Sequence, residues 1–258
     1  MMTDPIFYAA AIPAVFLVGL SKGGFGGAMA LLGVPLMALA IPPVQAAAIL
    51  LPILIVMDAV TLWTWRKHWD PTTLKIMVPG AVIGIAIGWA TAAWITDPVI
   101  RLIVGCVALW FVVRYVQLTL AARRRDEPPA PHGHQPVKGV LWSTLAGFTS
   151  FVSHAGGPPY QIYTLPLRQD PKTYTGTSVR FFAIVNAIKL APYFALGQFD
   201  ATNLSTSLAL APIAPIATLT GAYFVRRMKP EVFYPFMYAM VFLTSLKLIW
   251  DGLQHLLA

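Results

Sequence analysis

The feature that most constrains the fold is a pair of long apolar stretches, each interrupted by a short glycine-rich segment. The first interruption, residues 19–27, reads Gly-Leu-Ser-Lys-Gly-Gly-Phe-Gly-Gly, and the second, residues 154–159, reads His-Ala-Gly-Gly-Pro-Pro. The runs 23–57 and 139–167 contain no Asp, Glu, Lys or Arg, and both exceed the roughly 20 residues that cross a bilayer as a helix. Interrupted apolar segments at matching places in two halves are typical of transporters that bind substrate near the membrane midplane.

Composition supports a membrane protein. Of the 258 residues, 57% are hydrophobic and only 11% are charged, whereas soluble domains carry roughly 25% charged residues. The sequence therefore predicts an all-α polytopic membrane protein whose partners are a small substrate and the lipid bilayer. The lone Cys106 excludes a disulfide framework and a cysteine metal site. No P-loop is present, and we expect no cofactor apart from a coupling proton or sodium ion.

Apolar length and the positions of Pro, Gly and charge divide the chain into segments. The predicted segments are arms at 6–20 and 28–40, spans at 44–65, 75–94 and 98–121, a polar linker at 122–138, arms at 139–153 and 157–167, and spans at 174–198, 202–224 and 231–250.

Lys and Arg concentrate in alternate loops. Twelve of the eighteen basic residues lie near 66–75, 122–138, 168–172 and 226–229, whereas the turns near 95–98 and 199–203 contain none. Because short cytoplasmic loops are enriched in Lys and Arg, we place these basic loops in the cytoplasm and the C-terminus outside, in the periplasm. The net charge of +8 thus follows membrane topology, and we expect no nucleic-acid partner.

This orientation predicts an inverted repeat. Residues 139–167 begin and end next to cytoplasmic loops, and arms of fifteen and eleven residues reach only ~22 and ~17 Å against a core of roughly 30 Å. We therefore expect a re-entrant hairpin there and, by the same pattern, at 6–40. Repeat 1 (1–121) and repeat 2 (139–258) would each contain one hairpin and three spans. Asp58-Ala59-Val60 and Asn186-Ala187-Ile188 then correspond. The alternative is an eight-span protein with kinked helices.

The hairpin tips are the predicted binding site. Arms that start near Ala28 and Pro159 would direct unpaired backbone N–H groups at the midplane, where they suit an anion. The glycines could instead serve close helix packing. The candidate substrate-binding residues are Ser21, Lys22, Gly23, Gly24, Phe25, Gly26, Gly27, His154, Gly156, Gly157, Gln161, Asn186 and Lys189.

A charged residue inside the membrane is usually paired or faces a cavity. Asp58 could relay a proton, pair with Lys22 or Lys189, or form a silent ion pair that fixes helix packing. Tryptophans at segment ends are predicted to anchor the chain at the membrane surface: Trp63, Trp65, Trp69, Trp94, Trp142 and Trp250.

Residues 19–27 followed by Pro35, together with the second glycine-rich turn at 147–159, resemble the TauE/SafE (sulfite exporter, TSUP) family of membrane permeases. The resemblance rests on Lys22 to Gly27 and on Gly156-Gly157. It implies secondary transport of small sulfur-containing anions, such as sulfite or organosulfonates, in the bacterial inner membrane. We therefore expect an exporter, not an enzyme, that works by alternating access. The alternatives are an intramembrane enzyme using His154 and Asp58, or an uncoupled anion channel. The sequence leaves a homodimer open.

Overall fold

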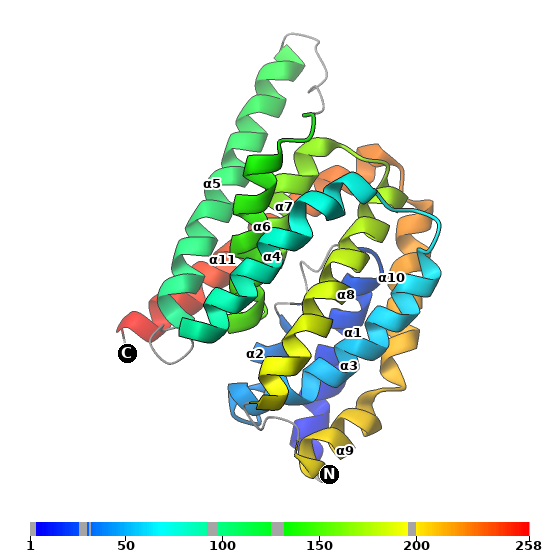
Figure 1. Cartoon of the computed structure of the whole chain (residues 1–258), viewed down its shortest axis with the longest axis vertical. Coiled ribbons are helices and arrows are strands. Elements are labelled where there is room, and N and C mark those ends of the chain that lie inside the picture. The colour runs from blue at the N-terminus through cyan, green and yellow to red at the C-terminus, as the bar shows by residue number, and fades with distance from the viewer. Residues whose placement is uncertain are drawn as a thin grey trace. The chain divides into compact units, whose positions relative to one another are not determined.

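The structure is a computed structural model that describes residues 4–25, 30, 32–91, 97–124, 132–195 and 200–257. This part of the chain contains eleven α-helices and no β-strand (Figure 1). The helices are α1 (Pro5–Gly24), α2 (Gly33–Met37), α3 (Pro43–Thr64), α4 (Pro71–Thr91), α5 (Asp97–Arg124), α6 (Pro136–Ser153), α7 (Gly157–Thr164), α8 (Pro171–Ala195), α9 (Ala201–Leu210), α10 (Ile213–Arg227) and α11 (Pro230–Leu257), with a 3-10 turn, η2 (Leu165–Leu167).

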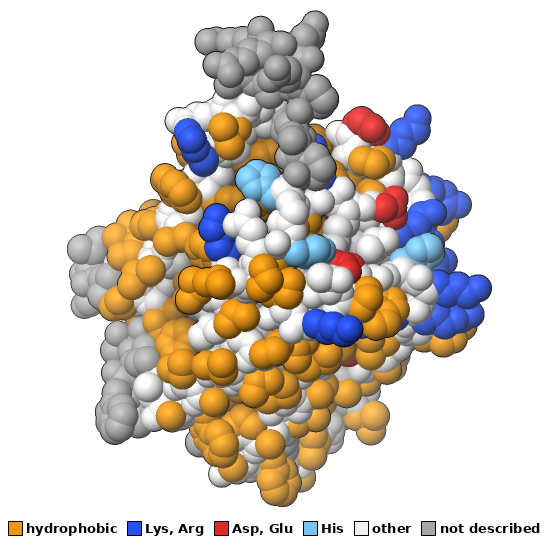
Figure 2. Space-filling model, turned by 45° about the horizontal axis from the view of Figure 1, so that its top comes forward, with side chains coloured by type: hydrophobic (Ala, Val, Ile, Leu, Met, Phe, Trp, Pro, Cys, Tyr) orange, Lys and Arg blue, Asp and Glu red, His pale blue; other side chains and the backbone are white. Residues whose placement is uncertain are grey.

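Several helices are built to cross a membrane. Five are long and apolar enough: α1, α3, α4, α5 and α11. The bent pair α9 and α10 would make a sixth span. Large hydrophobic side chains face outward, including Leu208 and Phe194, which are 75% and 76% exposed. Figure 2 shows hydrophobic side chains over much of the face that it draws. Such a surface suits lipid rather than water, so the predicted multi-pass membrane protein is confirmed.

The chain divides into two compact units that interleave in sequence. The first unit contains Met1–Leu74 and Pro171–Lys229, and the second contains Lys75–Asp170 and Pro230–Ala258. Each unit therefore takes one predicted hairpin and several spans, and each draws on both predicted repeats. Compact units and repeats are different divisions of a chain, so the predicted repeat boundaries stay a prediction.

In the first unit, α1 packs closely along α10, and α3 lies against α1, α8 and α10 (Figure 1). Small residues allow the α1–α10 approach. A Cβ atom built on Gly23 would lie 2.1 Å from the Thr218 carbonyl oxygen, and one on Gly24 would lie 2.7 Å from the Gly221 oxygen. Side chains at these positions would therefore force the two helices apart. Glycine-mediated contact of this kind is common between membrane helices.

The first predicted arm is longer than expected. It ends at Gly24 instead of residue 20, and its 20 residues extend ~30 Å, which is enough to cross a bilayer. The chain then folds back, because a Cβ on Gly33 in α2 would lie 2.6 Å from Val18 Cγ2 in α1. Whether the segment 6–40 enters and leaves on one face of the membrane stays a prediction.

In the second unit, α4 packs against α6 and α5 packs against α11. Glycines of α4 and α6 again lie against the backbone of the facing helix. A Cβ on Gly147 would lie 2.2 Å from the Ala81 oxygen, and one on Gly84 would lie 1.9 Å from the Thr144 oxygen. The first helix of each predicted hairpin thus packs through small residues onto a long helix. That helix is α10 for α1 and α4 for α6.

The second glycine-rich break lies where the sequence places it. α6 ends at Ser153 and α7 begins at Gly157, and η2 completes the predicted arm at 167. The two arms run back along each other, since a Cβ on Gly139 would lie 2.9 Å from the Tyr163 ring. The course of this hairpin relative to a bilayer stays a prediction.

Two predicted spans differ from simple apolar helices. The span expected at 202–224 is not one straight helix: α9 and α10 meet at a bend of 46°, and together they are long and apolar enough for one span. Pro212 lies at this bend, where its ring and missing N–H interrupt a helix. α8 matches the predicted span 174–198 closely, but it is not among the helices apolar enough to qualify alone. Its polar residues include Asn186 and Lys189, both buried.

Candidate functional site

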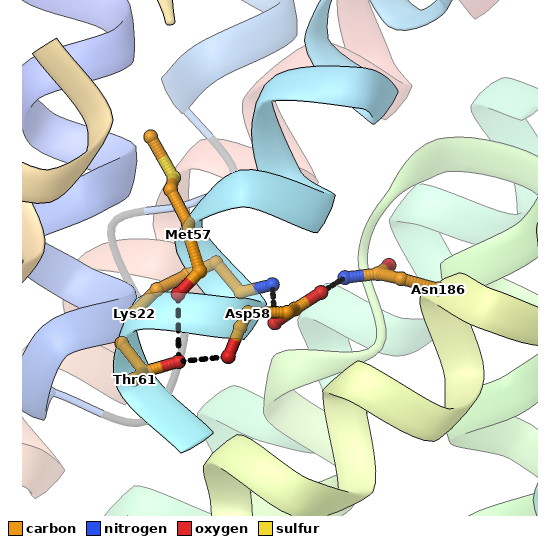
Figure 3. Close-up of polar contacts among 5 residues, drawn as sticks. All are labelled: Lys22, Met57, Asp58, Thr61 and Asn186. Carbon is orange, nitrogen blue, oxygen red and sulfur yellow. Dashed lines mark hydrogen bonds and ion pairs between the residues drawn. The ribbon is translucent and has the colours of Figure 1, made fainter. Parts of the chain in front are cut away.

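Three helices of the first unit bring Lys22, Asp58 and Asn186 into direct contact (Figure 3). From α1, the Lys22 Nζ group donates a hydrogen bond to Asp58 Oδ1 and forms a salt bridge with it. From α8, Asn186 Nδ2 donates to Asp58 Oδ2 at 2.7 Å. The three residues are 8%, 4% and 4% exposed. Both carboxylate oxygens of Asp58 therefore accept hydrogen bonds inside the protein.

Lys189 is a second buried lysine beside this cluster. It lies three residues after Asn186 on α8, so both side chains share one face of that helix. Lys189 is 0% exposed, and the charges of Lys22 and Asp58 both act on it. Within the described chain, the buried charged residues are Lys22, Lys189 and Asp58. With both lysines protonated, the cluster carries a net charge of one positive unit, which favours an anion as a further occupant.

Asp58 is fixed by its own helix as well as by its partners. One turn later on α3, Thr61 Oγ1 donates to the carbonyl oxygens of Met57 at 2.8 Å and Asp58 at 3.2 Å (Figure 3). The sequence left open whether Asp58 pairs with Lys22 or with Lys189. The structure shows the salt bridge to Lys22, and the role of Asp58 in coupling stays a prediction.

Lys22 lies in the last turn of α1, where a helix presents unpaired carbonyl groups. Two side chains satisfy those carbonyls: Trp65 Nε1 donates to the Gly23 oxygen at 2.8 Å, and Thr175 Oγ1 donates to the Gly24 oxygen at 3.1 Å. This end of α1 thus presents carbonyl oxygens, and the charge of Lys22 complements the partial negative charge of the helix C-terminus. The N–H groups predicted near Ala28 lie outside the described residues.

Neighbouring candidates have mainly structural contacts. Gly23 and Gly24 lie against α10, as described above. Ser21 and Phe25 are 0% and 4% exposed, and the Phe25 N–H donates to the Ser21 oxygen at 2.7 Å. The structure thus supports the packing interpretation of Gly23 and Gly24. Substrate binding by residues 21–25 stays a prediction. Gly26 and Gly27 lie outside the described residues.

Trp65 was assigned the wrong role by sequence. It was expected to anchor α3 at the membrane surface, but it is 0% exposed and bonded to Gly23. The signal that could have corrected this is its spacing from Asp58: residues 58, 61 and 65 share one helical face, and that face meets the end of α1. Thr61 and Thr175 were likewise missed, because isolated threonines in apolar helices have no distinctive pattern.

The second tip, in the second unit, is a tight turn centred on His154. His154 has a left-handed backbone with φ of 54°. Thr149 holds the turn: its carbonyl accepts the Ala155 N–H at 3.1 Å, and its hydroxyl donates to the Ala155 oxygen at 3.2 Å. α7 then starts Gly-Pro-Pro. Since proline has no N–H, the tip has fewer backbone donors than the predicted row.

The remaining candidates lie in the same unit as His154. Gly156, Gly157 and Gln161 are all buried, and Gln161 is 0% exposed. Lys22, Asp58, Asn186 and Lys189 belong to the first unit. That both tips hold one anion therefore stays a prediction. No group of His, Cys, Asp and Glu suited to a metal ion occurs among the described residues.

A comparison with protein families decides the class of the protein. Residues 11–248 match the model of a protein family, the sulfite exporter TauE/SafE. The chain belongs to the TauE/SafE family. This TauE/SafE protein is accordingly a membrane transporter of sulfite or related anions, and family membership favours transport over intramembrane catalysis. Searches of curated proteins and of solved structures found no significant match.

Proposed function

We propose that this chain is a secondary transporter that exports a small sulfur-containing anion, such as sulfite or an organosulfonate, across the bacterial inner membrane. The anion binds at Lys22 and Lys189, with Asn186 as a hydrogen-bond donor. The observation that carries the proposal is the buried cluster of two lysines and one aspartate in a TauE/SafE protein. A buried cluster with excess positive charge is costly unless an anion balances it.

Asp58 acts in this proposal as an internal counter-ion. Without substrate, the Asp58 carboxylate neutralises Lys22. An incoming anion that carries one negative charge competes for the same ammonium group, and the displaced carboxylate takes up one proton, so that the net charge of the site is conserved. Release of the anion returns Lys22 to Asp58 and expels the proton. This exchange would carry the anion and a proton in the same direction, so that export runs only while the outward anion gradient exceeds the opposing proton gradient. A sodium ion would couple only if it replaced the proton at Asp58.

Alternating access requires two repeats that can move against each other. Two observations support the predicted inverted repeat. The corresponding residues Asp58 and Asn186 touch at 2.7 Å, as equivalent positions do next to a two-fold axis. Each hairpin also packs through glycine onto the second predicted span of the other repeat: α1 on α10, and α6 on α4.

We place the linker 122–138 in the cytoplasm and the C-terminus in the periplasm.

Transport in proteoliposomes tests this function. We expect radiolabelled sulfite to accumulate against its concentration gradient when a pH gradient is imposed, and Lys22→Met to reduce the rate by about 100-fold or more, because a buried charge contact is worth several kcal/mol. Lys75→Met, which removes an exposed lysine, is the matched control. Wild-type rates in Lys22→Met would refute the site, and flux that only equilibrates sulfite would identify an uncoupled channel.

A further inference from the structure

A second concentration of positive charge lies at the end of α3, within the first unit. A cavity of about 410 Å³ opens between the end of α3, the start of α8 and the end of α10. Five of its lining residues are basic: Arg66, Lys67, His68, Lys172 and Arg226. No Asp or Glu occurs among the described residues that line it. Figure 2 shows Lys and Arg side chains gathered at one edge of the face that it draws, beyond the hydrophobic surface.

The two arginines of this cavity are held in place by its own walls. Arg226 Nη2 donates to the Thr64 carbonyl oxygen at 2.9 Å, and its Cζ lies 5.4 Å from the centre of the Trp65 ring. Arg66 Cζ lies 5.2 Å from the centre of the Trp63 ring. Stacking and a single carbonyl contact leave other N–H donors of each guanidinium available to a ligand.

A further arginine, Arg180, stabilises the part of the cavity wall formed by residues 65 and 66. Arg180 of α8 donates through Nη1 to the Trp65 oxygen at 3.1 Å and through Nη2 to the Arg66 oxygen at 2.9 Å. These carbonyls follow the last turn of α3, and the Trp65 oxygen also accepts the His68 N–H at 3.1 Å. The cavity wall is therefore fixed before any ligand arrives, which reduces the entropy cost of binding.

Trp65 connects this cavity to the buried cluster. It lines the cavity, and its Nε1 donates to the oxygen of Gly23, the residue after Lys22. On α3, Trp65 follows Asp58 by seven residues, which places it on the same face about 10 Å away along the helix axis. The Trp65 side chain is thus shared between the basic cavity and the end of α1 that carries Lys22.

We propose that this cavity is a second oxyanion site, a vestibule that takes the transported anion before Trp65 moves aside and admits it to Lys22. Among the described residues its lining is basic with no carboxylate, which suits a small oxyanion, and the guanidinium groups can donate hydrogen bonds to the oxygens of that anion. That the anion passes from the vestibule to Lys22 rests on the proposed function. The charge pattern of the loops places the vestibule on the cytoplasmic face, which is the loading side for an exporter.

Neutral variants of two lining residues test the vestibule. We expect Arg226→Gln and Lys67→Gln each to raise the KM for sulfite about threefold, as befits partly exposed charges, and to raise it further together. The increase should appear only when sulfite is offered from the vestibule side, and high salt should remove it. Arg227→Gln is the matched control, since that neighbouring side chain instead stacks on Tyr223 at 3.6 Å. Unchanged KM values in both variants would overturn the vestibule.

Direct binding separates this proposal from the proposed function. In neutral detergent without lipid, Lys22→Met should still bind sulfite by calorimetry, and adding Arg226→Gln should raise the Kd of that binding about threefold. Absence of any sulfite binding to Lys22→Met would overturn the vestibule while leaving Lys22 essential. Full transport by Lys22→Met would instead refute the central site. A lipid phosphate has the same chemistry as the anion, so a KM effect confined to phosphatidylglycerol liposomes, and absent in phosphatidylcholine, would also overturn the vestibule.

Discussion

At the scale of single residues, the salt bridge between Lys22 and Asp58 has two consequences that are difficult to separate. It keeps the Lys22 ammonium group where an anion can replace the Asp58 carboxylate as its partner. It also holds α1 against α3. A buried pair of this kind contributes little compared with two apolar residues, but removing one partner leaves the other charged and uncompensated at a cost of roughly 3–5 kcal/mol. Single substitutions at this pair will therefore affect folding as well as transport.

A double variant separates the two effects. We expect Lys22→Met combined with Asp58→Asn to unfold on heating at a temperature close to wild type, since both charges are removed together, whereas Asp58→Asn alone unfolds earlier. The double variant should still transport no sulfite. Thermal unfolding followed by size-exclusion chromatography, together with uptake in proteoliposomes, measures both properties. A double variant less stable than Asp58→Asn would contradict the charge-balance argument.

His154 gives a second prediction at this scale. A left-handed backbone is natural for glycine but strained for other residues, by up to about 1 kcal/mol. His154→Gly should therefore be more stable than His154→Ala, although both variants lack the imidazole. If the imidazole binds substrate, both should lose transport equally. Finding the glycine variant to be the less stable of the two would show that the turn needs a side chain there.

At the scale of elements, glycines decide how closely helices approach. Gly23→Ala would place a methyl group 2.1 Å from the Thr218 oxygen, so α1 and α10 must separate. We expect a loss of about 1–3 kcal/mol in unfolding free energy, as for other overpacked contacts. Gly133→Ala is the control, because a Cβ there meets nothing within 4 Å. Equal unfolding temperatures for the two variants would mean that α1 can move away from α10 without a loss of unfolding free energy.

The same elements show what the sequence could and could not predict. Apolar length and proline positions predicted α3, α4, α5 and the α6–α7 break closely, because these features act locally. The partner of Gly23 is Thr218, which lies far away in sequence. Packing glycines and ligand-binding glycines look alike along a chain, so only the fold distinguishes them. The bend at Pro212 could have been predicted, since proline interrupts a helix wherever it lies inside one.

The candidate site also has parts that the sequence predicted and parts that only the fold shows. Buried charges at 22, 58 and 189 stand out against apolar surroundings, and the sequence identified all three as candidates. That Lys22 forms a salt bridge with Asp58 depends on how α1 and α3 meet. The basic cavity was missed because its residues come from three separate loops and helix ends. Read along the chain, those residues indicate only which loops face the cytoplasm.

At the scale of the whole molecule, orientation in the membrane decides which face loads the substrate. In a Cys106→Ser background, Lys67→Cys should react with a membrane-impermeant maleimide only in inverted vesicles. Thr202→Cys, on the exposed start of α9, should react only in intact spheroplasts, because the turn near 199–203 lacks Lys and Arg. Gel-shift detection of the label measures both. The opposite pattern would reverse the orientation and make the vestibule a loading site for import.

The contact between Asp58 and Asn186 also bears on how a duplicated chain can evolve. If the two repeats arose from one ancestral gene, these positions began as identical residues facing each other. Two aspartates 2.7 Å apart could not both ionise, so they would have shared a proton and left only one charge. Drift of one copy to asparagine removes that constraint. The present pair carries the same single negative charge as that shared-proton pair, but the charge now belongs to Asp58 alone, and Asn186 is left as a permanent hydrogen-bond donor to it.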